Sequence, residues 1–236
     1  NENDGRDQAS VSCMTGGTLA GTPIDDCLAS DENSHTIGTV AFGNDGALFV
    51  TNGDGANYNS VDPRALLAQN IDSLSGKVLR IDPATGLGMP DNPYFDAANP
   101  GSNRSKVWSY GLRNPFRMAI EPTSGAPWVG DVGWGAWEEI NTGKGANFGW
   151  PCYEGAAVTG NASGSTHSRV QGTYATNTET APGCTTLYAE GTAQVTAPRY
   201  SYDHSGGGAS ANAGTFYSGA YYPERYQGAL FIADYD

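Results

Sequence analysis

One pattern recurs three times along this chain and constrains its fold more than any other feature. Each copy holds an apolar run, a turn with glycine, a second apolar run and then an aspartate, and the copies span 40–54, 118–131 and 221–234. Glycine adopts the positive φ of a tight turn without steric cost, so each copy predicts an antiparallel hairpin. The sequence therefore predicts repeated hairpins that each end at an aspartate.

Segments between these copies also predict regular structure. Residues 77–81 alternate between polar and apolar side chains and 106–110 form a similar run, so both are expected to be strands. The segment 62–70 is the one good helix candidate, with Asp62 as its N-cap and Pro63 at the first helical position.

Hairpins at irregular spacing, in a chain with 33 glycines, 13 prolines and 11% aromatic residues, are typical of an all-β fold. A β-propeller with long loops fits this spacing, and a β-sandwich is the alternative. A blade needs about 40–45 residues, so the chain is expected to hold roughly four blades. The ring is then incomplete, and missing segments or a partner chain are expected to complete it.

We expect residues 1–236 to form a single, partial propeller domain. Two stretches rich in Gly, Ser and Thr, at about 155–185 and 205–214, are expected to be long loop insertions. The chain starts with Asn rather than Met, which predicts a processed chain or a piece of a longer one.

The charge balance excludes several classes of partner. With 12 Lys and Arg against 25 Asp and Glu, the net charge is −13, which argues against nucleic acid and against anionic lipid surfaces. A stretch of 18 apolar residues does not occur, so no membrane span is predicted. An acidic surface is compatible with sugars, cations and cationic partners.

Four cysteines, at 13, 27, 152 and 184, allow three pairings. We favour two disulfides, with the sequence-local pairs Cys13–Cys27 and Cys152–Cys184 as one possibility. A zinc site is the rival interpretation, but the chain has neither a C-x-x-C motif nor close Cys and His spacing. Disulfides imply an oxidising compartment, so the protein is expected to be secreted or periplasmic.

His35 and Asp54 flank the first hairpin, which would bring them to one edge of a blade. A histidine held by a carboxylate is the usual general base, because the carboxylate fixes its tautomer and stabilises the imidazolium. The alternative is a structural histidine that bonds a loop. Arg113, in an apolar segment bounded by Gly and Pro, either pairs structurally or directs its donors at a ligand oxyanion.

Glu138 and Glu139 lie among glycine-rich turns that offer the oxygen ligands calcium prefers, although no EF-hand loop is present. The alternative is two solvated side chains at a strand end. His167 and His204 have no clear partner and are predicted to be surface residues.

Taken together, six segments resemble the motifs of one family, and they stand in that family's order. They are Ser34-His35-Thr36-Ile37-Gly38, Gly53-Asp54-Gly55, Gly76-Lys77-Val78-Leu79-Arg80, Gly111-Leu112-Arg113-Asn114-Pro115-Phe116-Arg117, Gly130-Asp131-Val132-Gly133 with Trp137-Glu138-Glu139-Ile140-Asn141, and Asn147-Phe148-Gly149-Trp150-Pro151. The chain resembles the glucose/sorbosone dehydrogenase family, the soluble pyrroloquinoline-quinone (PQQ) sugar dehydrogenases.

The resemblance implies a six-bladed propeller with PQQ in a pocket at one end of its channel. By this likeness His35 takes the proton from the anomeric hydroxyl of the sugar, and Asp54 orients His35. Arg113 stabilises negative charge on the quinone oxygen. Calcium held near the backbone oxygens of Gly133 and Trp134 polarises the cofactor.

A second, structural calcium is implied at Glu139 and the Phe148 carbonyl. Well-studied members also clamp the cofactor with Lys and Arg from later blades, whereas this chain ends Ala233-Asp234-Tyr235-Asp236. The expected function is a calcium- and PQQ-dependent aldose dehydrogenase that passes electrons to a separate acceptor. The alternatives are a non-catalytic extracellular propeller that binds a glycan, a cation or a protein, and a purely structural β unit.

Overall fold

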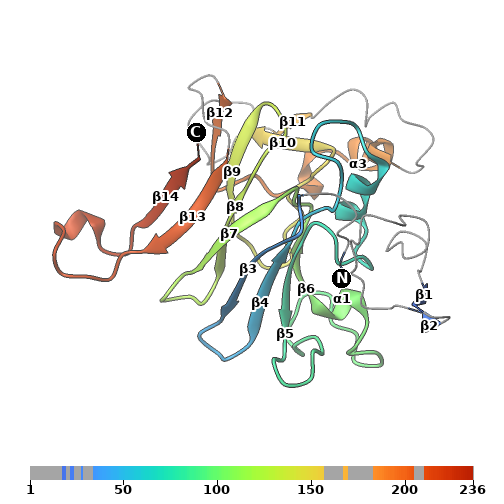
Figure 1. The fold of residues 1–236 in the computed structure, drawn as a ribbon, viewed down its shortest axis with the longest axis horizontal. Coiled ribbons are helices and arrows are strands. Elements are labelled where there is room, and N and C mark those ends of the chain that lie inside the picture. Colours follow the sequence, from blue (N-terminus) through green and yellow to red (C-terminus); the bar gives the residue numbers. More distant parts are fainter. Residues whose placement is uncertain are drawn as a thin grey trace.

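The computed structural model describes residues 18–19, 22–23, 28, 34–156, 167–169, 183–204 and 210–235. A first four-stranded antiparallel sheet follows the chain in order (Figure 1). Its strands are β3 (Ile37–Phe42), β4 (Leu48–Asn52), β5 (Lys77–Ile81) and β6 (Val107–Tyr110). The helices η1 (Pro63–Gln69) and α1 (Asn103–Lys106) precede β5 and β6.

A second four-stranded sheet repeats this arrangement. Its strands are β7 (Pro115–Ile120), β8 (Pro127–Asp131), β9 (Trp137–Asn141) and β12 (Tyr200–Asp203). Between β9 and β12 the chain makes a long excursion that carries β10 (Tyr153–Ala156), β11 (His167–Arg169), α3 (Gly183–Glu190) and η3 (Thr192–Gln194). The insertion predicted at about 155–185 falls in this excursion, mostly outside the described residues.

A third sheet has two strands among the described residues, β13 (Ala211–Phe216) and β14 (Leu230–Asp234). The helix η5 (Glu224–Tyr226) lies in their connection, and β1 (Thr18–Leu19) pairs with β2 (Thr22–Pro23) near the N-terminus. The predicted loop at 205–214 is shorter than expected, because 211–214 belong to β13; residues 205–209 lie outside the described part.

The first strands of the three sheets, β3, β7 and β13, lie side by side, so the sheets fan out from a common edge (Figure 1). Glycine permits this approach: a Cβ on Gly38 of β3 would lie 2.3 Å from the backbone oxygen of Pro115 in β7. This is the arrangement of propeller blades, which confirms the all-β prediction.

Each predicted repeat contributes one blade to the described part, which holds two complete sheets and two strands of a third. The spacing predicted about two blades in each of the two gaps between repeats, roughly four in all, but loops such as the excursion between β9 and β12 take up the additional residues. The ring is therefore partial, as expected.

Most predicted elements are present. Gly46 and Gly125 have φ values of 82° and 72° in the first two hairpin turns. The predicted helix is a 3-10 helix, with Asp62 accepting a hydrogen bond from the backbone N–H of Arg64.

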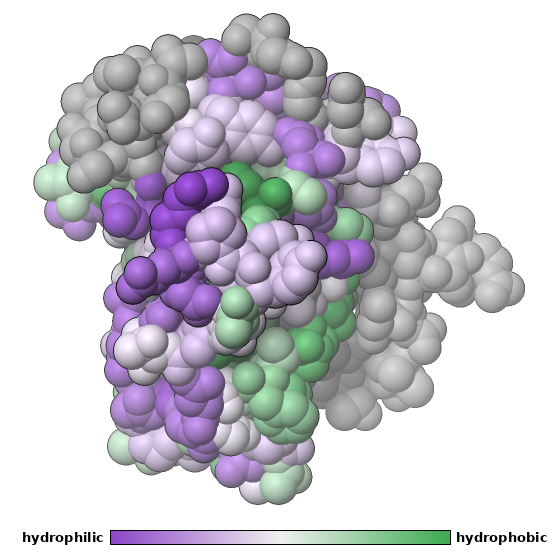
Figure 2. Space-filling view, turned by 90° about the vertical axis from the view of Figure 1, so that its left-hand side faces the viewer, coloured by the Kyte–Doolittle hydropathy of each residue, from purple (hydrophilic) through white to green (hydrophobic). Residues whose placement is uncertain are grey.

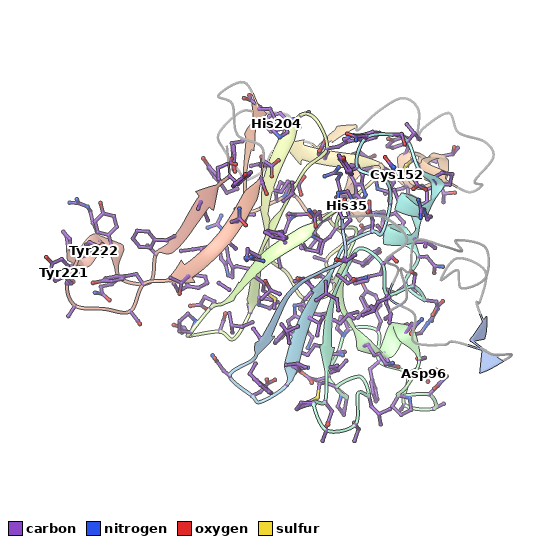
Figure 3. All side chains as sticks on the ribbon, in the orientation of Figure 1. His35, Asp96, Cys152, His204, Tyr221 and Tyr222 are labelled. Atoms are coloured by element: carbon purple, nitrogen blue, oxygen red, sulfur yellow. A yellow bond between two sulfur atoms is a disulfide. The ribbon has the colours of Figure 1, made fainter. Side chains whose placement is uncertain are left out.

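The third repeat is a correction, because its first strand is β13 rather than 221–222. Tyr221 and Tyr222 lie at the tip of the hairpin, where Tyr221 is 93% exposed (Figure 3). The pattern failed here because β13 is rich in Ala, Gly and Asn and lacks the apolar run that marks the other strands.

The face on which this hairpin lies is largely hydrophilic, with hydrophobic areas along one side (Figure 2). Within the described chain no helix is long and apolar enough to cross a membrane.

Apolar side chains fill the space between the first two sheets. Phe49 and Val78 from the first sheet meet Met118 and Val129 from the second, and each is buried. The fully buried Lys77 anchors η1 to β5, since its Nζ donates to the carbonyls of Leu67 and Ala68 at 3.1 and 2.9 Å. Burial lowers the pKa of Lys77 well below its usual value.

Cys152 and Cys184 form a disulfide, which joins β10 to α3 and confirms that predicted pair. Cys13 and Cys27 lie outside the described residues. Because Cys152 and Cys184 are bonded to each other, neither thiol is available as a zinc ligand. Both half-cystines are buried in a core cluster with Trp150 and Tyr153.

Replacing Cys152 and Cys184 with serine is expected to lower the free energy of unfolding by about 3–4 kcal/mol, because the cross-link closes a loop with a sequence separation of 32 residues. Urea unfolding followed by tryptophan fluorescence measures the change. A double variant as stable as the wild-type protein would contradict the assigned structural role.

Candidate functional site

His35 and Asp54 meet at the end of the first sheet. The His35 Nδ1 atom lies 2.8 Å from Oδ1 of Asp54, and both side chains are buried. Because an ionised carboxylate only accepts hydrogen bonds, Nδ1 carries the proton in this pair. His35 has a φ of 60°, a left-handed conformation that is uncommon for a residue other than glycine.

The backbone around the pair explains how His35 is held in this conformation. The N–H of Gly55 donates to the His35 carbonyl at 3.1 Å, and the N–H of Gly53 donates to Thr36 at 3.0 Å. A Cβ on Gly53 would lie 2.3 Å from the His35 carbonyl oxygen, so only glycine fits there. The segment Gly53-Asp54-Gly55 thus packs directly against the His35 backbone.

The Asp54 carboxylate has two further donors. The backbone N–H of Ala56 donates to Oδ1 at 2.9 Å, and the indole Nε1 of Trp150 donates to Oδ2 at 2.7 Å. Three groups therefore fix its orientation, and one comes from a residue 96 positions further along the chain.

Arg113 lies next to this pair. Its backbone carbonyl accepts from the N–H of Asp54 at 2.8 Å, and its guanidinium lies 5.5 Å from the ring centroid of Trp150. Nη1 donates to the carbonyls of Val132 and Gly133 at 3.1 and 2.7 Å. None of the ion pairs found among the described residues includes Arg113, although it is only 6% exposed.

The structure thus brings His35, Asp54 and Arg113 together around Trp150, a residue to which the sequence analysis gave no role. His35 lies near the centre of the molecule, at the start of β3 (Figure 3). The signal for Trp150 was weak: an aromatic residue between Gly and Pro, in one of the six segments that resemble the family.

The strand-end aspartates of the repeats are not equivalent. Asp131 and Asp234 pair with the first residue of the preceding strand. In the first sheet Asn52 holds that position, and Asp54 lies two residues further along. The predicted repeat is therefore out of register by two residues in its first copy.

This shift separates two roles of the carboxylates. Asp131 accepts from the backbone N–H groups of Arg113 and Asn114 at 3.0 and 2.7 Å, so it ties the start of β7. Asp234 accepts in the same way from the backbone ahead of β13. Asp54, beyond the strand, contacts the side chains of His35 and Trp150 in addition to the backbone N–H of Ala56.

Glu138 and Glu139 are both buried. The alternative prediction, that they are solvated side chains at a strand end, is therefore wrong. Glu139 accepts from Asn141 Nδ2 at 2.8 Å and from the N–H of Gly155. Burial raises the pKa of Glu139 to about 7. Burial also raises the pKa of Glu154 to about 7, although the Trp134 N–H donates to its carboxylate.

His204 is not a residue without a partner. Its Nε2 lies 2.9 Å from Oε1 of Glu138, whose other oxygen accepts from the N–H of Ala211 at 2.7 Å (Figure 3 locates His204 beside β9 and β12). Burial raises the pKa of Glu138. The side chain of His167 lies outside the described residues.

Several of the groups that were predicted to hold calcium take part in hydrogen bonds within the protein. The Gly133 carbonyl accepts from the Arg113 guanidinium at 2.7 Å. The N–H of the neighbouring Trp134 donates to Glu154. Both oxygens of Glu139 accept protein hydrogen bonds.

The residues do fit an anionic quinone such as PQQ. Arg113 is a buried cation that is satisfied by carbonyl dipoles rather than by a carboxylate, so it can bind anionic oxygens without breaking an ion pair. The aromatic rings of Trp150 and Trp134, 6.0 Å apart, lie beside it.

Comparisons with known proteins concern the family of the chain. A family model described as Glucose / Sorbosone dehydrogenase matches residues 25–235. The aldose sugar dehydrogenase YliI of Escherichia coli (strain K12) is 37% identical over 119 residues, which are 50% of this chain and 29% of that protein.

Solved structures are similar as well. The soluble aldose sugar dehydrogenase of Escherichia coli in its apo form is 29% identical, with a TM-score of 0.55 over 83% of this chain and 47% of that chain. The PQQ-bound aldose sugar dehydrogenase of Streptomyces coelicolor is 35% identical, covering 52% and 32%, with a TM-score of 0.43. The chain spans less than half the length of each of these proteins, and its fold is part of the sugar dehydrogenase propeller.

Proposed function

The chain belongs to the glucose/sorbosone dehydrogenase family, and from this premise we propose that its His35 site oxidises an aldose sugar at the anomeric hydroxyl with PQQ as the cofactor. The observation that carries the proposal is the buried His35–Asp54 pair, with Nδ1 and Oδ1 2.8 Å apart. The carboxylate holds Nδ1 as the donor, so Nε2 is the basic atom. No described residue bonds Nε2, which leaves it for the substrate.

In the proposed reaction, Nε2 of His35 accepts the proton of the anomeric hydroxyl as the C–H bond of the same carbon breaks. Asp54 stabilises the imidazolium that results, because its negative charge lies on the opposite side of the ring. PQQ, when bound, supplies the quinone that takes up the hydride. The product is the lactone, and the proton leaves His35 to solvent.

Arg113 is proposed to bind the negative charge of the cofactor. The carbonyls of Val132 and Gly133 and the face of Trp150 orient its guanidinium without neutralising it. A buried cation of this kind is well suited to an oxyanion. Calcium is proposed to assist from the backbone oxygens of Gly133 and Trp134, since the Gly133 carbonyl has a second lone pair beside the one that accepts from Arg113.

The proposal also covers the domain organisation, the substrate, the electron acceptor and the location of the protein. We propose a single propeller domain, a sugar substrate, a separate electron acceptor, and a location outside the cytoplasm. The Cys152–Cys184 disulfide supports the location, since such bonds persist in oxidising compartments.

PQQ titration, followed by absorbance, tests the proposal. We expect saturable binding by the wild-type protein and binding at least about tenfold weaker in Arg113→Met, because a charge-assisted contact is lost. Arg117→Met is the matched control, since Arg117 is an exposed arginine of the same segment that stacks on Phe116. Wild-type protein without saturable binding would favour the alternative, a non-catalytic propeller that binds a glycan, a cation or a protein.

A further inference from the structure

Trp150 contacts two of the three proposed functional side chains with two different parts of its ring. The edge donates through Nε1 to Oδ2 of Asp54 at 2.7 Å. The face lies 5.5 Å from the Arg113 guanidinium. Trp150 itself is 4% exposed, so both contacts are shielded from water.

The backbone of Trp150 is fixed independently of these contacts. Its N–H donates to the Gly111 carbonyl at 3.0 Å, and its own carbonyl accepts from Gln69 Nε2 at 2.7 Å. Gln69 and Asn147 also exchange two hydrogen bonds through their amide groups, at 3.0 and 2.8 Å. These hydrogen bonds fix the backbone of Trp150 and join η1 to the segment after β9.

The contact with Asp54 has a specific consequence. A carboxylate can rotate about its terminal bond, and a partial rotation would turn both of its oxygens away from the His35 ring. The Ala56 N–H holds Oδ1 and the Trp150 indole holds Oδ2, so the carboxylate cannot turn without breaking a hydrogen bond. The imidazole keeps its tautomer only while a carboxylate oxygen faces Nδ1.

We propose that Trp150 is a positioning residue that orients the Asp54 carboxylate toward His35 and, with its ring face, aligns Arg113 beside them. The inference rests on the proposed function for its catalytic meaning. Its structural content, a hydrogen bond that governs the His35–Asp54 pair, can be measured without turnover.

The competing interpretation is that Trp150 only fills the core, because it packs with Cys152, Tyr153 and Leu187. Trp150→Phe separates the two, since phenylalanine keeps an aromatic ring and lacks the N–H donor. Trp108→Phe is a matched control. Trp108 also lies beneath an arginine, with the Arg80 guanidinium 5.4 Å from its ring, but its buried Nε1 has no hydrogen-bond partner among the described residues.

Proton NMR of the His35 Nδ1–H resonance gives the first readout. In the wild-type protein this proton is shielded from exchange by its bond to Asp54. We expect Trp150→Phe to broaden the resonance through exchange with water, and Trp108→Phe to leave it unchanged. An unchanged resonance in Trp150→Phe would overturn the proposal.

Kinetics give the second readout. If the protein oxidises sugars with added PQQ, kcat in Trp150→Phe is expected to fall by roughly tenfold with little change in the sugar KM, because the base is misoriented rather than the substrate lost. Equal losses in Trp150→Phe and Trp108→Phe would indicate general packing and overturn the proposal. Absence of sugar oxidation in the wild-type protein would remove the proposed function and leave the NMR result interpretable.

A reciprocal variant covers the case in which Trp150→Phe does not fold. In Asp54→Asn, the Nε1–H resonance of Trp150 is expected to shift and to exchange faster, while that of Trp108 stays in place. An unmoved Trp150 resonance would show that the indole does not depend on the carboxylate, and would overturn the proposal.

Discussion

Replacing His35 with alanine is expected to lower kcat/KM for PQQ-dependent sugar oxidation by roughly a thousandfold, the typical contribution of a positioned general base. The variant retains the cofactor contacts of Arg113, so PQQ affinity is expected to change little. Dye-linked oxidation of an aldose by the PQQ-loaded protein measures the first effect, and absorbance titration measures the second.

Backbone strain must be separated from the loss of the imidazole, because His35 has a φ of 60°. His35→Asn serves for this purpose: asparagine adopts positive φ more readily than alanine but has no basic nitrogen. Both variants are expected to lose activity to a similar extent. His204→Ala removes a histidine that is hydrogen-bonded to Glu138, outside the site. This variant is expected to retain the activity. Unchanged turnover in His35→Ala would exclude the proposed base.

The convergence of these residues was only partly visible in the sequence. A hairpin between β3 and β4 is a local structure, so the turn residues alone placed His35 and Asp54 at one edge. The placement of Arg113 beside them depended on the family resemblance. It arises because the first strands of adjacent sheets pack closely, a tertiary relation that no spacing in the chain encodes.

Trp150 could not be assigned at all from the sequence. Its partner Asp54 is 96 residues away, and the contact depends on how η1 and the 147–150 turn dock against each other. The same reason explains the missed Glu138–His204 pair, which forms across the long excursion between β9 and β12.

Local patterns also misled where composition was atypical. The exposed Tyr221 and Tyr222 look like a strand, whereas the true strand β13 is built from small residues. The repeated aspartates suggested three equivalent positions, and only pairing register reveals that Asp54 is displaced by two residues.

Raising the pH from 5 to 8 in calcium-free buffer is expected to lower the free energy of unfolding by on the order of 5 kcal/mol. Burial raises the pKa values of Glu139 and Glu154 from 4.5 to about 7. Between these pH values the folded protein retains protons that the unfolded chain has lost, so stability falls as pH rises. The stabilisation is fully present below pH 4.5 and is lost as the pH rises through 7.

Other titrating carboxyl groups act in a different range. The arginine partners of Asp45, Asp72 and Asp91 lower the pKa values of those groups, and their contribution is lost only as the pH falls below about 4. The window between pH 5 and 8 therefore reports buried carboxyl groups. Burial also raises the pKa values of Asp131 and Glu138, whose titration adds to the same fall in stability. Urea unfolding at pH 5, 6, 7 and 8, followed by tryptophan fluorescence, measures the slope.

A double variant, Glu139→Gln with Glu154→Gln, supplies the control, since glutamine keeps the carbonyl acceptors for Gly155 and Trp134 but does not ionise. Its stability is expected to fall less steeply than that of the wild-type protein across the same range and to exceed it at pH 8, because the contributions of Glu139 and Glu154 are removed while those of Asp131 and Glu138 remain. A wild-type stability that is flat or rises with pH would contradict the assignment. Addition of calcium gives a further test. Because protein donors bind both oxygens of Glu139, added calcium is expected to leave the slope of wild-type stability against pH unchanged. A slope abolished by calcium would show that Glu139 releases these donors and binds the ion.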